Sequence, residues 1–397
     1  MRYALAKPRF LKTSLTLAAV VATSLLVASS ALAWSPLATT PASTASSLNA
    51  AACVGDYWTS SSPTGPGSAC YGWGSYTSAA GATGAGAQLG TNLLGTYTLG
   101  TVSATIRGVD CTPNGQCVQA GERQGYAIAT GSNLAVALAP AGAVTSRLNA
   151  VSCNAAGACM AVGHYTDSAG KRHGYAVVRA SPSSSWFQAY QHVATDSSLT
   201  GVSCLNARCY VVGTQTGGVS PLAIALTYTW STGVMSTATL PVGFSWRELN
   251  GISCIENFSQ TKCLAVGDTK TTLSGPTIPL YLQSTFASNS TSTVAYTPEP
   301  GTPAAPAAAT VTRLNGAACY WDVVNGFRCR AVGDSDATGA VQPYVGSLTS
   351  AAVSAYGASA TATGTACYDT GPGVYCWDVG TSTTSGVTQA IYSGSAV

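Results

Sequence analysis

The chain is 397 residues long and contains 17 Lys and Arg, 14 Asp and Glu and only 3 His. Four of the basic residues and none of the acidic ones lie in the first 33 positions, so residues 34–397 carry 13 basic and 14 acidic side chains, a net charge of −1. Because this part has no basic block or stripe, nucleic acid and anionic membrane surfaces are poor candidates for partners.

Residues 1–33 have the three parts of a secretory signal peptide. A basic head is followed by an apolar run at 15–27 and by the small-residue cleavage site Ala31-Leu32-Ala33. The apolar run is short for a membrane span, so we expect a cleaved protein without a membrane span, secreted to the extracellular space or the periplasm. An uncleaved anchor is the alternative.

The remaining residues, 34–397, contain a unit that occurs seven times. Each unit has a pair of cysteines, a glycine four residues after the second cysteine, an apolar residue five before the first, and a small residue three before it. The first cysteines are Cys53, Cys111, Cys153, Cys204, Cys254, Cys319 and Cys367, and their partners are Cys70, Cys117, Cys159, Cys209, Cys263, Cys329 and Cys376. The glycines are Gly74, Gly121, Gly163, Gly213, Gly267, Gly333 and Gly380. The repeats start near residues 48, 106, 148, 199, 249, 314 and 362, and this regularity predicts a repeat architecture.

The cysteine pairs predict disulfide bonds rather than zinc sites. All 14 cysteines are used, and a signal peptide directs the chain to an oxidising compartment. The gaps between partners hold 4 to 16 residues, whereas structural zinc sites favour gaps of about two to four. We expect one disulfide within each repeat.

The local pattern of each repeat favours β-strands. Apolar, polar and small residues alternate over 249–254, a second apolar run begins at Cys263, a third strand is expected at 175–178 and a weaker fourth at 186–192. Residues that face each other on antiparallel strands lie at distances that a disulfide can bridge. The pair Cys153 and Cys159 is therefore expected to join the first two strands of a hairpin.

The spacing of the repeats predicts an all-β fold, a seven-bladed β-propeller with about 50 residues per blade and one disulfide within each blade. The small residue before each first cysteine would let the innermost strands approach one another. Only one strand fits after Gly380, so 34–47 is expected to supply the strand that closes the last blade. The Pro- and Ala-rich segment 297–310 is predicted to be a solvated loop.

The unit Leu-Asn-Gly-Val-Ser-Cys, a short gap and Cys-x-Ala-Val-Gly resembles a repeat of many secreted bacterial proteins that are expected to be β-propellers. The resemblance covers nearly all of 34–397, and the third to sixth copies match best. It implies a fold and export, but no activity and no catalytic residue. The last copy departs from it, because Ala362 replaces the leucine and the segment after Cys376 reads Trp377-Asp378-Val379.

Aromatic residues gather in the loops between the paired cysteines of repeats five, six, seven and one, which a closed ring would place side by side. We predict that they form an arc that binds a glycan or a surface protein, since Tyr and Trp dominate binding hot spots. The alternative is that long loops cover themselves with their own rings. The candidate ligand-binding residues are Tyr57, Trp58, Phe258, Tyr320, Trp321, Phe327, Tyr368 and Tyr375.

A second candidate site uses the residue that follows the repeated glycine. This position is occupied by Glu122, His164, Asp268 and Asp334. In a propeller these residues would begin loops at the mouth of the central channel that the blades surround. Such side chains can serve acid and base chemistry or hold a cation, although ordinary polar loop starts have the same composition. The segment 334–339 also resembles the start of a calcium loop, but Val345 stands where the closing Glu would be.

The function predicted from these features is that of a secreted, monomeric, non-catalytic binding or adhesion protein without cofactor or metal. The alternative is an extracellular hydrolase or lyase that acts on a polysaccharide with carboxylates at the channel. The sequence contains neither a Gly-x-Ser-x-Gly nor a His-Glu-x-x-His motif. A structural component of the envelope is a third possibility.

Overall fold

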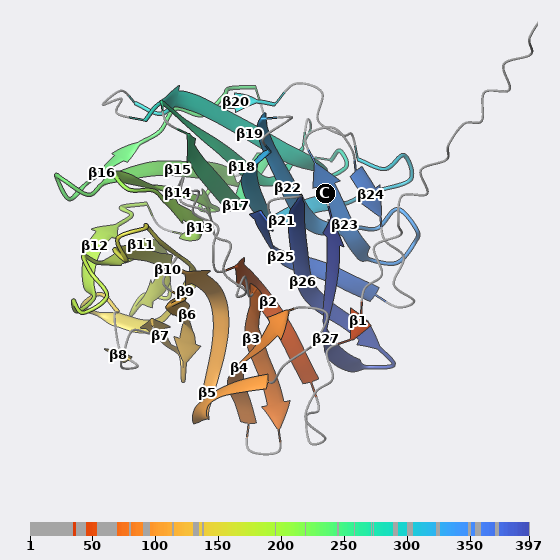
Figure 1. The fold of residues 1–397 in the computed structure, drawn as a ribbon, viewed down its shortest axis with the longest axis horizontal. Coiled ribbons are helices and arrows are strands. Elements are labelled where there is room, and N and C mark those ends of the chain that lie inside the picture. The colour runs from red at the N-terminus through yellow and green to blue at the C-terminus, as the bar shows by residue number, and fades with distance from the viewer. Residues whose placement is uncertain are drawn as a thin grey trace, which may run out of the picture. The chain divides into compact units, whose positions relative to one another are not determined.

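The computed structural model describes most of the chain after residue 44, and every regular element in the described part is a β-strand (Figure 1). The described residues are 35–36, 45–53, 70–78, 81–89, 96–112, 115–129, 135–136, 139–194, 196–218, 220–243, 246–257, 259–270, 272, 274–288, 293–299, 305–322, 326–347, 351–353, 359–369 and 373–396. In this part no helix is long and apolar enough to cross a membrane.

The strands form seven antiparallel sheets, numbered here by repeat, and the first two sheets share the long strand β5. Sheet 1 contains β2 (Ala45–Cys53), β3 (Cys70–Ser78), β4 (Gly81–Leu89) and the start of β5 (Thr96–Cys111). Sheet 2 contains the end of β5, β6 (Cys117–Arg123), β7 (Tyr126–Ala129) and β8 (Ala135–Val136). Sheet 3 contains β9 (Ala143–Cys153), β10 (Cys159–Asp167), β11 (Arg172–Arg179) and β12 (Phe187–Gln191).

The other four sheets follow the same order. Sheet 4 contains β13 (Ser197–Cys204), β14 (Arg208–Gln215), β15 (Leu222–Thr229) and β16 (Val234–Thr237). Sheet 5 contains β17 (Trp246–Asn257), β18 (Gln260–Lys270), β19 (Ile278–Ala287) and β20 (Thr297–Pro298). Sheet 6 contains β21 (Thr312–Asp322), β22 (Gly326–Ser335), β23 (Gln342–Ser347) and β24 (Ala351–Val353). Sheet 7 contains β25 (Ser359–Asp369), β26 (Val374–Thr384), β27 (Val387–Ala396) and β1 (Ser35–Pro36), which pairs with β27.

Each pair of cysteines joins the first two strands of its repeat, as the spacing predicts. Cys153 lies directly opposite Cys159 in the register of β9 and β10, and the other six pairs have equivalent positions. The two Cα atoms of each pair are 3.9 to 4.0 Å apart. Seven disulfides therefore staple seven hairpins.

A β-bulge at the same place in all seven first strands accounts for the repeated glycine. In sheet 5 the register shifts between Leu249 and Gly251, so Asn250 is the extra residue. The bulge brings the carbonyl oxygen of Glu248 over Gly267, where an added β-carbon would lie 2.0 Å from it. In every repeat the corresponding distance is 1.8 to 2.2 Å, so only glycine fits there.

The first strands of successive repeats pack against one another in a closed circuit, from β2 through β5, β9, β13, β17 and β21 to β25 and back to β2. Figure 1 shows β2 and β25 side by side although they come from opposite ends of the described chain. The small residues make these contacts possible. A β-carbon on Gly251 would lie 3.0 Å from the Cα atom of Gly316, and one on Gly364 would lie 3.0 Å from that of Ala50.

The bulged side chains link six of the seven sheets to the next one, the exception being Arg107 of sheet 2, which pairs with Glu122. These six side chains form a belt. Each amide or hydroxyl in the belt donates a hydrogen bond to the backbone oxygen of the apolar residue that opens the next repeat. The bonds run from Asn49 to Ile106 (2.6 Å), Asn149 to Leu199 (2.7 Å), Thr200 to Leu249 (2.5 Å), Asn250 to Leu314 (2.9 Å), Asn315 to Ala362 (2.9 Å) and Thr363 to Leu48 (2.7 Å). The last bond joins the seventh repeat to the first.

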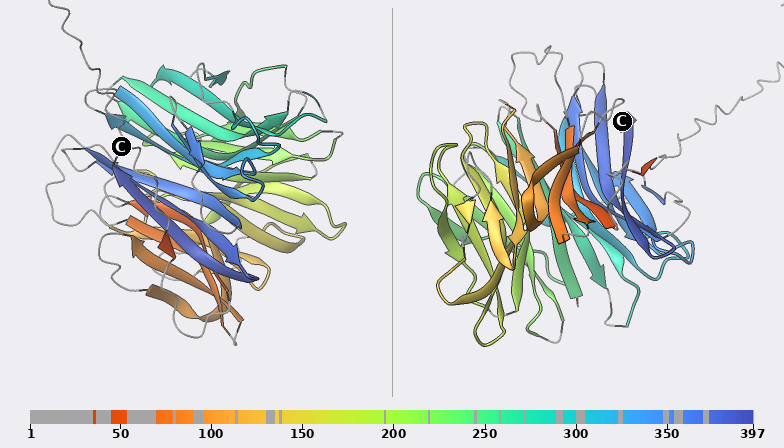
Figure 2. Two further views of the ribbon diagram at one scale, coloured as in Figure 1. Left: turned by 90° about the vertical axis from the view of Figure 1, so that its right-hand side faces the viewer. Right: turned by 90° about the horizontal axis from the view of Figure 1, so that it is seen from below.

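Apolar side chains fill the spaces between neighbouring sheets. Between sheets 4 and 5, for example, Val212 packs with Leu249 and Leu282, and each of these residues is fully buried. Figure 2 shows the sheets from the side, with the hairpins of neighbouring sheets extending in the same direction. Each sheet thus buries its faces against the next one, and the repeats share their cores.

The segment 297–310 differs in part from the predicted loop. Its first two residues form β20, which pairs with β19 through Leu282 and Gln283. At its other end the Asp336 carboxylate accepts hydrogen bonds from the backbone N–H groups of Thr310 (2.8 Å) and Val311 (2.9 Å). Residues 300–304 lie outside the described part.

Candidate functional site

A cavity of about 780 Å³ lies among the first strands near the cysteine hairpins. Residues from the first strands of all seven repeats line it. Most of its wall comes from the two residues that precede each first cysteine, such as Val151 and Ser152 in sheet 3 or Ala317 and Ala318 in sheet 6. These side chains are small or β-branched, and they leave the space open.

The cavity has an aromatic side formed by Tyr320, Trp321 and Tyr368. These residues lie on β21 and β25, which continue past their cysteines to Asp322 and Asp369. In sheets 3 and 4 the first strand ends at its cysteine. The longer hairpins therefore raise an aromatic wall on one side of the cavity only.

Polar side chains line the neighbouring part of the cavity. Glu256 and Asn257 lie at the end of β17, and Asn206 lies in the hairpin turn of sheet 4. Their carboxylate and amide groups can donate and accept hydrogen bonds. The cavity thus combines a wall of rings with a few polar groups, which is the usual composition of a small-molecule site.

The structure brings together three of the eight predicted aromatic residues. Tyr375 lies opposite Tyr368 in the register of sheet 7, with ring centroids 6.3 Å apart, and it is 41% exposed. Phe327 lies opposite Trp321 and packs under the ammonium group of Lys262, which is 5.4 Å from the ring centroid. Neither residue lines the cavity. Tyr57, Trp58 and Phe258 lie outside the described residues.

Asp110 lines the cavity, but its carboxylate is held by the protein. It accepts hydrogen bonds from the backbone N–H groups of Cys111 (2.9 Å) and Cys153 (2.6 Å) and from the Ser152 hydroxyl (3.1 Å). Burial raises the pKa of Asp110 to about 6. Serines in the same position bind the N–H group of the next cysteine in three later repeats, namely Ser152 to Cys204, Ser203 to Cys254 and Ser253 to Cys319. Asp110 therefore belongs to a second belt that links neighbouring hairpins.

The residues of the second candidate site lie far from this cavity. Glu122, His164, Asp268 and Asp334 each stand five residues past the second cysteine, about 17 Å along the strand at the rise of an antiparallel sheet. They lie within β6, β10, β18 and β22 and do not begin loops, because the second strand continues beyond the bulge opposite the glycine. The predicted loop position is therefore wrong.

Asp268 and Asp334 form one half of this second set. Asp268 is 1% exposed, accepts a hydrogen bond from the Asn250 amide at Oδ1 (3.1 Å) and has a buried Oδ2 without a partner among the described residues. Burial and the neighbouring Glu248, its cross-strand partner, raise the pKa of Asp268 to about 6. Asp334 accepts a bond from the Asn315 amide (3.0 Å), and burial raises its pKa as well.

Glu122 and His164 form the other half, in sheets 2 and 3. Glu122 makes an ion pair with Arg107 (2.7 Å), and Nδ1 of His164 lies 2.9 Å from the Ser198 hydroxyl. Burial, with Arg147 and two other arginines nearby, lowers the pKa of His164 to about 3. No hydrogen bond or ion pair within the described ranges joins this half to Asp268 or Asp334. The predicted quartet thus falls into two separate pairs.

Metal ligands do not gather in the described part of the chain, where no group of three or more His, Cys, Asp or Glu side chains could hold an ion. In the segment that resembles a calcium loop, Asp334 is bonded to Asn315 and Asp336 to residues 310 and 311. The segment is a polar turn that fixes the end of 297–310.

No protein-family model matches the sequence, and no curated protein matches it. Among solved structures, Trypanosoma rangeli sialidase in complex with sialic acid is similar at 7% identity and a TM-score of 0.46, over 91% of this chain and 59% of the sialidase. The GH74 xyloglucanase from Xanthomonas campestris is similar at 11% identity and a TM-score of 0.44, over 79% of this chain and 53% of the enzyme. A protein of unknown function from Dyadobacter fermentans is similar at 8% identity and a TM-score of 0.43, over 91% and 97%. The chain thus spans little more than half of the length of the two enzymes.

Proposed function

We propose that residues 34–397 form a seven-bladed β-propeller that is exported as a monomer and binds a glycan in the cavity beside the cysteine hairpins. The seven stapled hairpins and the closed circuit of first strands support the propeller. The signal-like residues 1–33 and the seven disulfides support export, because such bonds persist in oxidising compartments.

The observation that carries the binding proposal is the composition of the cavity. A sugar ring has an apolar face of C–H groups and a rim of hydroxyls. Trp321 and Tyr320 offer rings on which the apolar face can stack. Asn206, Glu256 and Asn257 offer amides and a carboxylate for the hydroxyls. The volume of about 780 Å³ lies in the range of roughly 300 to 1,000 Å³ that ligand pockets occupy.

The proposed role is binding without catalysis, because only one of the two acids that line the cavity, Glu256, is available to a ligand, and the other, Asp110, is already engaged. The oxygens of Asp110 accept three hydrogen bonds that hold neighbouring hairpins together. A general acid or base needs to reach the reacting atom with a hydrogen bond of its own. Asp110 is therefore better suited to a structural role than to proton transfer.

One observation favours a second candidate function, an extracellular glycan hydrolase or lyase with its site at the other end of the first strands. Asp268 has a raised pKa and an unpartnered oxygen, and Glu248 stands beside it across the strand pair. Paired carboxylates in different environments are typical of acid and base pairs in glycoside hydrolysis. This function would place the chemistry away from the aromatic cavity.

The test is a glycan-array screen of residues 34–397 with titration calorimetry on the best hit. We expect Trp321→Ala to weaken binding at least about tenfold, since a stacked ring contributes about 1.4 kcal/mol or more in a binding pocket. Trp186→Ala is the matched control, because Trp186 packs beside Arg179 in sheet 3 and does not line the cavity. An equal loss of glycan affinity in both variants, or no loss of affinity in Trp321→Ala, would refute the proposed binding site in the cavity.

The second candidate function, that of a hydrolase or lyase, is tested on the glycan that binds best in the array, by following the release of new sugar chain ends. Cleavage by the wild-type chain that is lost in Asp268→Asn would favour the second function. Binding without cleavage favours the first.

A further inference from the structure

Three arginines meet at the end of sheets 2 and 3 that lies away from the cysteine hairpins. Arg107 is the bulged residue of β5, Arg147 lies opposite His164 in the register of β9 and β10, and Arg172 begins β11. The strands β5 and β9 are in contact, since a β-carbon on Gly108 would lie 2.7 Å from the Cα atom of Ala150. The topology therefore brings three guanidinium groups from two neighbouring sheets to one place.

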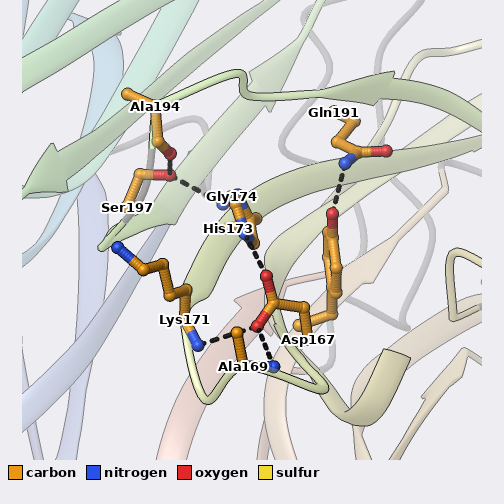
Figure 3. Close-up of polar contacts among 9 residues, drawn as sticks. Asp167, Ala169, Lys171, His173, Gly174, Gln191, Ala194 and Ser197 are labelled. Carbon is orange, nitrogen blue, oxygen red and sulfur yellow. Dashed lines mark hydrogen bonds and ion pairs between the residues drawn. The ribbon is translucent and has the colours of Figure 1, made fainter. Parts of the chain in front are cut away.

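The nearby acids do not neutralise this cluster. Glu122 is bound to Arg107 at 2.7 Å. Figure 3 shows the Asp167 carboxylate turned to His173 (3.0 Å) and to the turn, where it accepts hydrogen bonds from the backbone N–H groups of Ala169 and Lys171 (both 2.9 Å). Two of the three arginines therefore remain without a carboxylate partner.

Arg147 is the least compensated of the three. Its side chain makes no ion pair or hydrogen bond within the described ranges, and its Nε is buried without a partner. Arg172 donates one hydrogen bond to the Thr216 hydroxyl (3.3 Å), and its Nε is likewise buried and unpartnered. His164 adds no negative charge, because an imidazole is either neutral or positive, and its Nδ1 is already bonded to the Ser198 hydroxyl.

A half-buried cation without a counter-ion is costly, and an anion of matching shape removes that cost. Burial and the charges of Arg107 and Arg172 lower the pKa of Arg147, and the charge of Glu122 offsets only part of this effect. A guanidinium offers planar, parallel N–H donors that fit a carboxylate with two hydrogen bonds. The amide of Asn149 and the hydroxyls of Ser198 and Thr216 surround the cluster with further polar groups.

We propose that Arg147, flanked by Arg107 and Arg172, binds the carboxylate of an acidic sugar residue such as a uronate. The carboxylate site stands on the arrangement of the arginines alone. Its assignment to a sugar rests on the proposed glycan-binding function. The site lies at the opposite end of the first strands from the aromatic cavity, so the two sites can be tested separately.

The experiment is titration calorimetry of residues 34–397 with trigalacturonic acid, with a neutral galactose trimer and with acetate, at 0.15 M and 0.5 M NaCl. We expect the acidic trimer to bind at least about tenfold more tightly than either of the other two probes. Arg147→Gln should abolish this preference, and Arg147→Lys should keep only part of it because a lysine lacks the planar pair of donors. Equal affinity for the two trimers would overturn the proposal.

The matched control is Arg328→Gln, because Arg328 lies opposite Tyr320 near the hairpins. If this variant loses as much affinity for the acidic trimer as Arg147→Gln, the trimer is attracted by positive charge in general and the proposed site is wrong.

If acetate binds as tightly as the acidic trimer, the carboxylate site stands and the sugar assignment fails. Acidic-trimer binding that depends on Arg147 but survives Trp321→Ala supports this site even where the cavity proposal fails. Urea unfolding midpoints within about 0.3 M of the wild type would show that the variants are folded.

Discussion

The carbonyl oxygen of Glu248 lies so close to Gly267 that a β-carbon on this glycine would stand 2.0 Å from it. The contact follows from the bulge at Asn250, which turns the backbone of β17 toward β18. The same bulge directs the Asn250 amide to the backbone oxygen of Leu314 in the next sheet. The repeated glycine and the link between neighbouring sheets are therefore two results of one distortion.

Replacing Gly267 with alanine should destabilise the protein by about 3 kcal/mol, because the new methyl group meets backbone that cannot move without breaking the bulge. The urea unfolding midpoint measures this change. Gly373→Ala is the control, since Gly373 is exposed and has nothing within 4 Å of an added β-carbon. Similar midpoints for the two variants would show that the bulge does not require glycine.

The hairpins could be predicted from the sequence, but the bulges could not. Cys263 stands four residues before Gly267, as the second cysteine does in every repeat, and its pairing with Cys254 implies a hairpin whatever the length of the loop between them. The bulge adds one residue to a strand without changing the composition around it, so Asn250 reads as an ordinary strand residue. The glycine was visible as a repeated position, and its reason becomes clear only from the carbonyl that faces it.

Removal of one short disulfide should cost about 2 kcal/mol in the chain-entropy model. The double variant Cys153→Ala and Cys159→Ala opens a loop with a sequence separation of 6. The equivalent change at Cys53 and Cys70, with a separation of 17, should cost about 1 kcal/mol more because a longer loop gains more freedom when it is opened. Urea unfolding without reductant measures the free energy of unfolding of both double variants. A larger loss of stability in the Cys153 and Cys159 variant than in the Cys53 and Cys70 variant would contradict this explanation.

Thr363 tests the closure between the last repeat and the first. Its hydroxyl donates to the backbone oxygen of Leu48 at 2.7 Å. Thr363→Val keeps the shape and removes the donor, so we expect a loss of about 1 kcal/mol in the free energy of unfolding. Thr383→Val is the matched control, because the Thr383 hydroxyl is exposed and meets only Thr388. No difference between the variants would mean that this bond does not stabilise the circuit.

The contributions of Asp110 and Asp268 to stability should fall as the pH rises from about 4 to about 6, whereas the contribution of His164, whose pKa is lowered to about 3, rises in the same window. The pKa values of Asp110 and Asp268 are raised to about 6 in the folded chain, against about 3.9 in an unfolded one. Each of these two carboxyls therefore binds more of its proton in the folded state than in the unfolded state in this window, and each contributes a slope of at most about 1.4 kcal/mol per pH unit. Asp268→Asn removes one of the falling contributions, so the urea midpoint of this variant should rise relative to that of the wild type as the pH goes from 4 to 6.

Asp167 provides the control for this pH series. Bonds from the backbone of Lys171 and from His173 lower the pKa of Asp167, so its contribution is lost only as the pH falls below about 4. Asp167→Asn should leave the slope between pH 5 and 6 unchanged. A difference in midpoint between Asp268→Asn and the wild type that stays constant from pH 4 to pH 6 would contradict the raised pKa of Asp268.

Only the aromatic part of the candidate site could be predicted from the sequence. Tyr320, Trp321 and Tyr368 could be chosen because they follow first cysteines in long hairpins. Asn206 and Glu256 line the same cavity, but single polar residues in a turn and near a strand end carry no sequence signal. The structural role of Asp378 was also missed, because a single acidic residue after the second cysteine carries no sequence signal. It is fully buried and binds Arg330 and the Thr365 hydroxyl.

The most direct test of the proposed function is a crystal structure of residues 34–397 soaked with the best hit of the glycan array. We predict a sugar ring stacked within about 4 Å of the Trp321 ring, with its hydroxyls bonded to Glu256 or Asn257, inside the cavity among the first strands. Sugar density only at other places on the protein, with the cavity occupied by solvent alone, would contradict the account.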